Sequence, residues 1–249
     1  MKKRVSLFIQ CLVESIYPAV GEAMVAVLER AGVEVGYPDG QTCCGQPAFN
    51  SGYRHEARAA ARHFVSLFAD AEHIVCPSGS CVHMIRHHYP DLLAGEDRKT
   101  RELARRIAAN CFEFSEYLVD VLKIEDVGAQ FPARVTYHDS CHLLRGLGVG
   151  TQPRALLTRV AGLELVEMKD SDVCCGFGGT FSVNYAEISA ALVDEKVDNI
   201  VATGADYVVG CDMSCLMNIQ GRLSRRREQT QVKHLAEILA STGGRDDRG

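Results

Sequence analysis

Short apolar runs alternate with longer amphipathic segments along this chain, and the whole alternation occurs twice. Apolar runs lie at 4–11, 33–38 and 72–76, and again at 134–141, 163–168 and 206–211. Runs of this length, bounded by glycine or polar residues, predict strands. Four longer segments carry apolar residues at helical spacing: 17–32, 53–70, 152–162 and 185–204. These segments predict helices between the strands.

Strands that alternate with helices predict parallel sheets covered by helices. We therefore expect an α/β protein with two tandem pseudo-repeated lobes, each a small mostly parallel sheet flanked by helices. The first domain should span 1–127 and the second 128–241, followed by a disordered tail at 242–249. The segment 86–110 has no counterpart in the second half and predicts a helical insertion, with His87 and His88 at its surface.

Cysteines mark matching positions in the two halves. Each half has a single cysteine, then an adjacent pair followed by glycine, then another single cysteine, and matching residues are 130, 131 and 134 positions apart. Functional groups gather at the carboxyl ends of parallel strands, where these cysteines are predicted to lie, so we expect them to converge on one crevice. The two sets are Cys11, Cys43, Cys44 and Cys81, and Cys141, Cys174, Cys175 and Cys215.

Four thiolates suit either zinc or an iron–sulfur cluster. Structural zinc sites and ferredoxin clusters use short, compact spacings, whereas these cysteines come from distant strand ends. The adjacent pairs favour a polynuclear cluster, and a tetrahedral zinc ion stays open as an alternative. Gly45 and Gly176 follow the pairs, and glycine lets the backbone turn tightly and bring its N–H groups near sulfur. We expect both glycines to contribute to cofactor binding.

Three further cysteines lie outside this repeat. Cys76 and Cys211 precede the last cysteine of their halves and are additional candidate metal ligands. Cys111 has no counterpart, and we expect it to be a buried structural residue, because a free cysteine commonly behaves as a small hydrophobic residue.

Charge and cysteine content narrow the class of protein. The net charge is -5, which argues against a nucleic-acid partner, since such proteins usually carry a basic excess. We expect no transmembrane segment, because none of the apolar runs approaches the roughly 20 residues of a membrane span. The apolar start of the chain is better explained by a strand than by a signal peptide. Clustered cysteines without an export signal predict a cytoplasmic protein with metal or redox chemistry.

The segment around Cys141 offers candidates for further chemistry. His138 and His142 lie on either side of it, and an imidazole can bind a metal or carry a proton for a hydroxy-acid substrate. Arg145 is a candidate for binding a carboxylate. The glycines after Gly176 do not have the G-x-G-x-x-G spacing of a dinucleotide site. We find no flavin fingerprint, P-loop or paired catalytic carboxylates, so oxidation of a substrate would need partner subunits.

Several segments together resemble a known family. They are "DGQTCCGQPAFNSGY", "CPSGSC", "HDSCH", "CCGFGGTFSVN" and "CLMNIQGRL". The repeated pattern resembles the CCG cysteine-rich domain family and, over essentially the whole chain, the lactate utilization protein A family of iron–sulfur oxidoreductases.

The resemblance implies a redox component that helps to oxidise L-lactate to pyruvate. It implies sister subunits, including a ferredoxin-type iron–sulfur protein, and a small 2-hydroxy acid as substrate. It also implies one iron–sulfur cluster per domain, of an unusual non-cubane 4Fe-4S type in some relatives, held by the CCG cysteines.

This chain departs from the general family pattern at one point in each half. The pattern ends in C-x-x-C, but Ser78 and Asp212 stand where its first cysteine is expected. The cluster type is therefore open. A zinc-stabilised scaffold subunit and a thiol–disulfide redox subunit, like heterodisulfide reductase, are the alternative functions.

Overall fold

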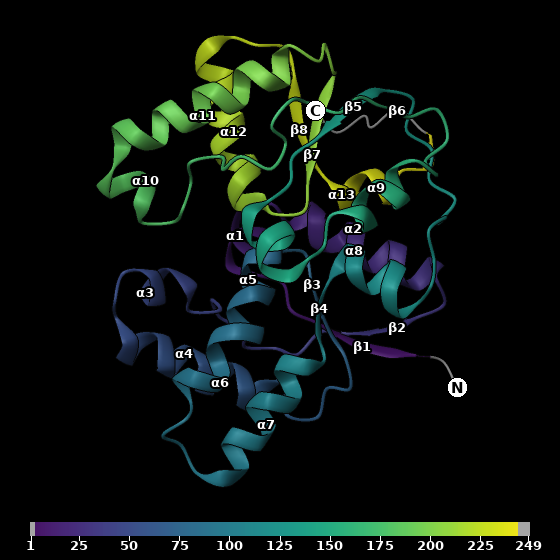
Figure 1. Cartoon of the computed structure of the whole chain (residues 1–249). Helices are drawn as coiled ribbons and strands as arrows, with labels where there is room; N and C mark the ends of the chain where they lie inside the picture. Colours follow the sequence, from purple (N-terminus) through teal and green to yellow (C-terminus); the bar gives the residue numbers. More distant parts are fainter. Residues whose placement is uncertain (1–2, 244–249) are drawn as a thin grey trace.

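The computed structural model describes residues 3–243 and contains two four-stranded sheets. Every strand pair in both sheets is parallel, with the orders β2-β1-β3-β4 and β6-β5-β7-β8. Helices cover the sheets, and the two lobes lie one above the other in Figure 1. The predicted α/β fold with two tandem lobes is confirmed. The strands are β1 Arg4–Leu7, β2 Glu34–Gly36, β3 Ile74–Cys76, β4 Cys111–Glu113, β5 Arg134–Tyr137, β6 Glu164–Leu165, β7 Tyr207–Gly210 and β8 Gln231–His234.

The duplication extends to the register of the strands. Arg4 at the start of β1 pairs with Glu34 of β2, and Arg134 at the start of β5 pairs with Glu164 of β6. The side chains form ion pairs of 3.7 Å and 3.6 Å. Both pairs are exposed, so each contributes little free energy. They show that the two lobes align residue by residue from their first strands.

The four predicted helices are present. They are α2 Pro18–Arg30, α4 Arg54–Leu67, α9 Thr151–Leu157 and α11 Ala186–Val201. Gly32 and Gly204 follow α2 and α11 with positive φ angles, the conformation in which glycine commonly ends a helix. The other α-helices are α1 Cys11–Ile16, α3 Gln46–Asn50, α5 Gly79–His83, α6 Tyr89–Leu92, α7 Arg98–Ala109, α8 Phe114–Glu116, α10 Phe181–Asn184, α12 Met213–Arg226 and α13 Leu235–Ala240. The π-helical segments are η1 Met84–His88, η2 Tyr117–Val121 and η3 His142–Gly146.

The fourth strand of each sheet was not predicted from the sequence. β4 and β8 are only three and four residues long and lie at sheet edges. Their sequences, CFE and QVKH, mix polar and apolar residues over too short a length to give a periodic signal.

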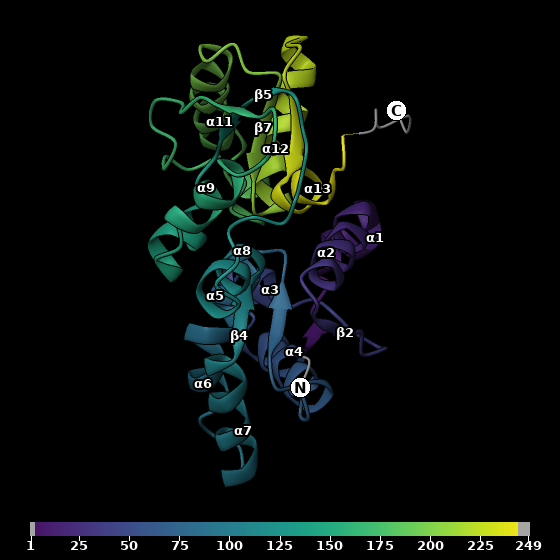
Figure 2. The same ribbon diagram turned by 90° about the vertical axis from the view of Figure 1, so that its right-hand side faces the viewer.

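The insertion in the first lobe begins later than the sequence suggested. α5, η1 and α6 form one uninterrupted helix over residues 79–92. This helix matches α12, whose bounds lie 134 positions further along the chain at both ends. The extra segment is therefore 93–110, which contains α7. Ala104, Ile107 and Ala108 form the buried face of α7, and Figure 2 shows this helix at the far end of the first lobe.

The lobes exchange their last helices. α13 packs against α2 of the first lobe, while α8 and η2 pack against α9 of the second. Both figures show α13 beside α2. Arg30 fixes this contact, because its guanidinium donates hydrogen bonds to the carbonyl oxygens of Leu239 and Ala240 at 3.1 Å and 3.0 Å. One hydrophobic core therefore runs through both lobes, in addition to a smaller core within each lobe.

The predicted tail, 242–249, lies outside the described residues except for Thr242 and Gly243. Thr242 forms an isolated bridge with Gln130, in the segment that joins the lobes. None of the helices within residues 3–243 combines the length and hydrophobicity needed to cross a membrane.

Candidate metal-binding site

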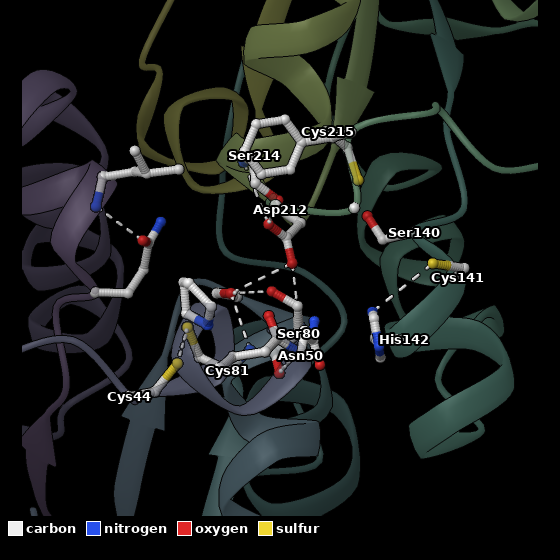
Figure 3. A pocket seen from close by; sticks show the side chains of 18 of the residues that line it. Cys44, Asn50, Ser80, Cys81, Ser140, Cys141, His142, Asp212, Ser214 and Cys215 are labelled. Carbon is white, nitrogen blue, oxygen red and sulfur yellow. Dashed lines mark hydrogen bonds between the residues drawn. The ribbon is translucent and has the colours of Figure 1, made fainter. Parts of the chain in front are cut away.

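Both cysteine sets lie at the point where the strand order of their sheet reverses. In the first lobe β1 and β3 are neighbours, and their connections leave in opposite directions, which opens a crevice at their carboxyl ends. The second lobe repeats this arrangement with β5 and β7. The two crevices face each other and form one cavity of about 200 Å³, seen in Figure 3. All eight repeated cysteines line it: Cys11, Cys43, Cys44, Cys81, Cys141, Cys174, Cys175 and Cys215.

The thiols of the first lobe form a connected row. Cys43 lies between Cys11 and Cys44, and the Sγ atoms of Cys44 and Cys81 are 3.3 Å apart. Hydrogen bonds from the Cys11 and Cys44 thiols lower the pKa of Cys43 to about 3. The same interactions with Cys43, together with burial, raise the pKa values of Cys11 and Cys44. Cys43 is thus a thiolate at neutral pH, the form in which cysteine binds metals.

The second lobe repeats this row. Hydrogen bonds from the Cys141 and Cys175 thiols lower the pKa of Cys174 to about 2. The backbone N–H of Gly176 also donates to the Cys174 Sγ atom at 3.3 Å. The Cys175 thiol lowers the pKa of Cys215 to about 6 against the effect of burial. The first cysteine of each CCG triplet is therefore the preferred thiolate of its set.

His138 distinguishes the two sets. It is only 1% exposed, and neither ring nitrogen has a hydrogen-bond partner among the described residues. One of its ring nitrogens lies within 4.8 Å of the Sγ atoms of both Cys175 and Cys215. The matching residue of the first lobe is Phe8, 130 positions earlier. An unsatisfied buried polar group costs about 1–3 kcal/mol, and a metal ion held with these two thiols would remove that cost. The residues present thus fit a metal centre.

The glycine of each triplet is required by the backbone. Gly45 and Gly176 have φ angles of +81° and +83°, in the left-handed region that side chains disfavour. A Cβ on Gly176 would lie 2.5 Å from the carbonyl oxygen of Ser189 in α11, and one on Gly45 would lie 3.0 Å from the Cβ of Ala60 in α4. These glycines let the CCG turns lie directly against the helices that follow.

Each CCG turn is also held by the helix that carries the last cysteine. The hydroxyl of Tyr89 donates to the carbonyl oxygen of Cys44 at 2.9 Å in the first lobe. In the second lobe the side-chain amide of Asn218 donates to the carbonyl oxygen of Cys175 at 2.8 Å. The two lobes thus use different residues, Tyr89 and Asn218, to hold the CCG turn. The spacing of the cysteines in the sequence does not identify these residues.

The cysteines outside the repeat do not line the cavity. Cys76 is buried beside Cys81, and burial raises its pKa to about 11. Cys211 lies 3.4 Å from the hydroxyl of Tyr137 in the central core. Cys111 is buried in β4, and burial raises its pKa to about 12. Cys76 is thus adjacent to the first set, Cys211 belongs to the core between the lobes, and Cys111 is buried as expected.

Ser78 and Asp212, which replace the expected cysteines, pair across the cavity. Ser78 caps α5 by accepting the Cys81 N–H, and Asp212 caps α12 by accepting the Ser214 N–H. The Asp212 carboxylate also accepts hydrogen bonds from the Ser78 hydroxyl at 3.2 Å and the Ser80 N–H at 3.0 Å. Figure 3 shows Asp212 directed toward Ser80. The sequence marked both positions as departures from the pattern but gave no sign that they meet.

The other predicted candidates occupy different places. His142 lines the cavity, and its Nδ1 atom is 3.7 Å from the Cys141 Sγ atom. Arg145 is not among the lining residues. Interaction with Cys174 and burial raise the pKa of Cys141, and the nearby Arg145 charge opposes this. Arg145 therefore acts on the site electrostatically, and a ligand inside the cavity would not contact it directly.

Comparison with known proteins agrees with this geometry. The family model described as "CCG: Cysteine-rich domain" matches residues 5–86 and 135–220. Lactate utilization protein A of Geobacillus thermodenitrificans is 49% identical over 236 residues, covering 95% of this chain and 98% of that protein. Lactate utilization protein A of an Exiguobacterium species is 50% identical over 237 residues, covering 94% and 96%.

A solved structure shares the fold. The hypothetical protein from Helicobacter pylori superposes with a TM-score of 0.69 at 12% identity, over 97% of this chain and 49% of that chain. At this identity the likeness concerns the fold alone. Fold and cysteine sets together define a tandem CCG cysteine-rich-domain protein. On the relatives and their coverage, this chain belongs to the lactate utilization protein A family.

Proposed function

We propose that this protein is an iron–sulfur oxidoreductase component of a multi-subunit system that oxidises L-lactate to pyruvate. The observation that carries the proposal is the pair of duplicated thiol rows facing one cavity, each with a thiolate at its centre. The substrate is inferred from the names of the relatives. The partners we propose are sister subunits, including a ferredoxin-type iron–sulfur protein.

Each lobe would hold one cluster. The ligands in the first are Cys11, Cys43, Cys44 and Cys81, and in the second Cys141, Cys174, Cys175 and Cys215, with His138 beside the last two. When bound, such clusters exchange single electrons, and oxidation of lactate to pyruvate releases two electrons and two protons.

The protein's own residues shape the space between the two sets. Gln10, Gln46 and Asn50 line the cavity from the first lobe and Ser140 from the second. These side chains are neutral and can donate and accept hydrogen bonds, as the hydroxyl and carboxylate of a small 2-hydroxy acid require. His142 and Asp212 also line the cavity.

Metal analysis of protein purified without oxygen tests the proposal. We expect iron and acid-labile sulfide, with an electron paramagnetic resonance signal after reduction. Cys43→Ser and Cys174→Ser should each remove about half of the iron, whereas Cys111→Ala should retain it. Stoichiometric zinc without iron or sulfide, in a complex that stays active, would instead support the scaffold function. Turnover blocked by iodoacetamide with the metal content unchanged would support thiol–disulfide chemistry.

The substrate needs a separate test. A deletion strain should fail to grow on L-lactate, and the wild-type gene should restore growth where the Cys174→Ser gene does not. Normal growth of the deletion strain on lactate, with loss of growth on glycolate, would refute the substrate assignment and leave the redox site intact.

A further inference from the structure

Four of the nine histidines gather beside the cavity, at the contact between the lobes. His83, His87 and His88 belong to the helix formed by α5 and η1, and His142 belongs to η3 of the second lobe. The ring centroid of His83 lies 4.7 Å from that of His87, 5.3 Å from that of His88 and 4.9 Å from that of His142. We call these four residues the histidine cluster.

Two π-helical segments create this arrangement. A π-helix bonds residue i to i+5 and has a wider turn than an α-helix, so residues four and five positions apart both approach the same side. His83 therefore contacts both His87 and His88 through η1, while η3 presents His142 from the opposite lobe. Single π-helical turns inside helices are rare and occur frequently at functional sites.

The duplicated fold does not require the cluster. The residues that match His83, His87 and His88 are Met217, Gly221 and Arg222, 134 positions later, and Leu12 matches His142. The matching segments of η1 and η3 belong to α12 and α1, which are regular α-helices. Both the histidines and the π turns thus break the internal symmetry of the protein, and they do so at the same place.

The surroundings of His83 leave one of its ring nitrogens, the buried Nδ1 atom, without a hydrogen-bond partner among the described residues. The ring packs against Gly146 of η3, where an added Cβ would lie 2.9 Å from the His83 Nε2 atom. A neutral imidazole with a free nitrogen is the form that binds transition metals.

We propose that His83, His87 and His142 bind a divalent transition-metal ion such as Zn²⁺ beside the cysteine cavity, with His88 next to them. Among the described residues, the group whose ligand atoms already lie within 4.8 Å of one another is His138, Cys175 and Cys215. Binding at the histidine cluster thus involves rotation of side chains, for which the exposed His87 is free. The ion would join the two lobes next to Cys141, whose Sγ atom is 3.7 Å from His142.

Equilibrium dialysis of the full-length protein against Zn²⁺ tests this site, whatever occupies the cysteines. Because His87 is exposed, His87→Gln should fold normally, which circular dichroism can verify. We expect His87→Gln and His142→Gln each to bind one Zn²⁺ fewer per chain than the wild type at saturation. The matched control is His55→Gln, an exposed histidine that pairs with Glu56 in α4. It should bind as much as the wild type.

X-ray absorption at the zinc edge identifies the ligands of the additional ion. In protein whose cysteine sets are filled with iron and sulfide, we expect nitrogen at about 2.0–2.1 Å. Two results would overturn the proposal: equal zinc content in wild type and His87→Gln, or sulfur ligands at about 2.3 Å around the additional ion.

Discussion

Ser78 donates a hydrogen bond to the Asp212 carboxylate at 3.2 Å across the boundary between the lobes. The two residues are 134 positions apart and match each other in the duplicated halves. Each caps the helix that carries the last cysteine of its own set. The two positions where the general CCG pattern led us to expect cysteine thus connect the two halves of the site, through one buried carboxylate.

Asp212→Ala should destabilise the protein. Asp212 is 2% exposed and accepts from Ser78, Ser80 and Ser214, so its loss leaves buried donors unsatisfied. We expect a decrease of about 1–3 kcal/mol in the free energy of unfolding, measured by urea denaturation. Asp39→Ala, at an exposed loop position, is the control and should change it by less than about 0.5 kcal/mol. Equal stability of both variants would show that the contact across the lobes contributes nothing.

Thiol reactivity should follow the pKa pattern in reduced, metal-free protein. The pKa values of Cys43 and Cys174 are lowered to about 3 and about 2 by the thiols beside them. Their alkylation by iodoacetamide should therefore be nearly constant between pH 5 and 7, whereas the rate of an ordinary thiol rises about tenfold per pH unit. Peptide mapping by mass spectrometry measures each site, with buried Cys111 as the unreactive control. A tenfold rise in the alkylation rate of Cys43 per pH unit would contradict the lowering of its pKa by the Cys11 and Cys44 thiols.

Glu113 should make stability depend on pH. It is fully buried, and burial raises its pKa from 4.5 to about 7. Between pH 4.5 and 7, Glu113 holds a proton in the folded state that it has lost in the unfolded state. The stability that comes from burying neutral Glu113 is therefore fully present below about pH 4.5 and is lost as the pH rises through 7. We expect Glu113→Gln to be more stable than wild type at pH 8, by up to about 3 kcal/mol.

Urea denaturation of wild type and Glu113→Gln at pH 5 and pH 8 provides the measurement. Other titrating groups are common to both proteins, so the difference between the two curves isolates Glu113. A difference in stability that does not change with pH would refute the assignment.

Gly176→Ala should disturb the second CCG turn far more than Gly179→Ala. Both glycines have positive φ, so both substitutions introduce backbone strain of about 1–3 kcal/mol. A Cβ on Gly176 would in addition lie 2.5 Å from the Ser189 carbonyl oxygen, whereas one on Gly179 would meet nothing within 4 Å. We expect Gly176→Ala alone to lose metal from the second set, measured by elemental analysis. Equal metal loss in both variants would mean that backbone strain, rather than contact with α11, controls the turn.

The sequence predicted the features that occur once in each half and are repeated from one half to the other. The four helices between the strands, six of the eight strands and the grouping of each cysteine set follow from apolar periodicity and a nearly constant offset between the halves. The features that arise between the halves were missed, because spacing carries no information on how two lobes face each other. His138 was considered for its proximity to Cys141 in sequence, yet the structure places it with Cys175 and Cys215. The contact of Ser78 with Asp212 and the histidine cluster were missed for the same reason, since both form between the two lobes.

The exchange of last helices sets the order in which this protein can fold during synthesis. The apolar face of α2 is made early but is covered by α13, which ends at Ala240. The first lobe therefore cannot finish burying this part of its core until residues 235–240 have left the ribosome. The cavity between the lobes would be assembled last, when both rows of thiols are already present, so a metal bound by both sets would enter after both lobes have been made.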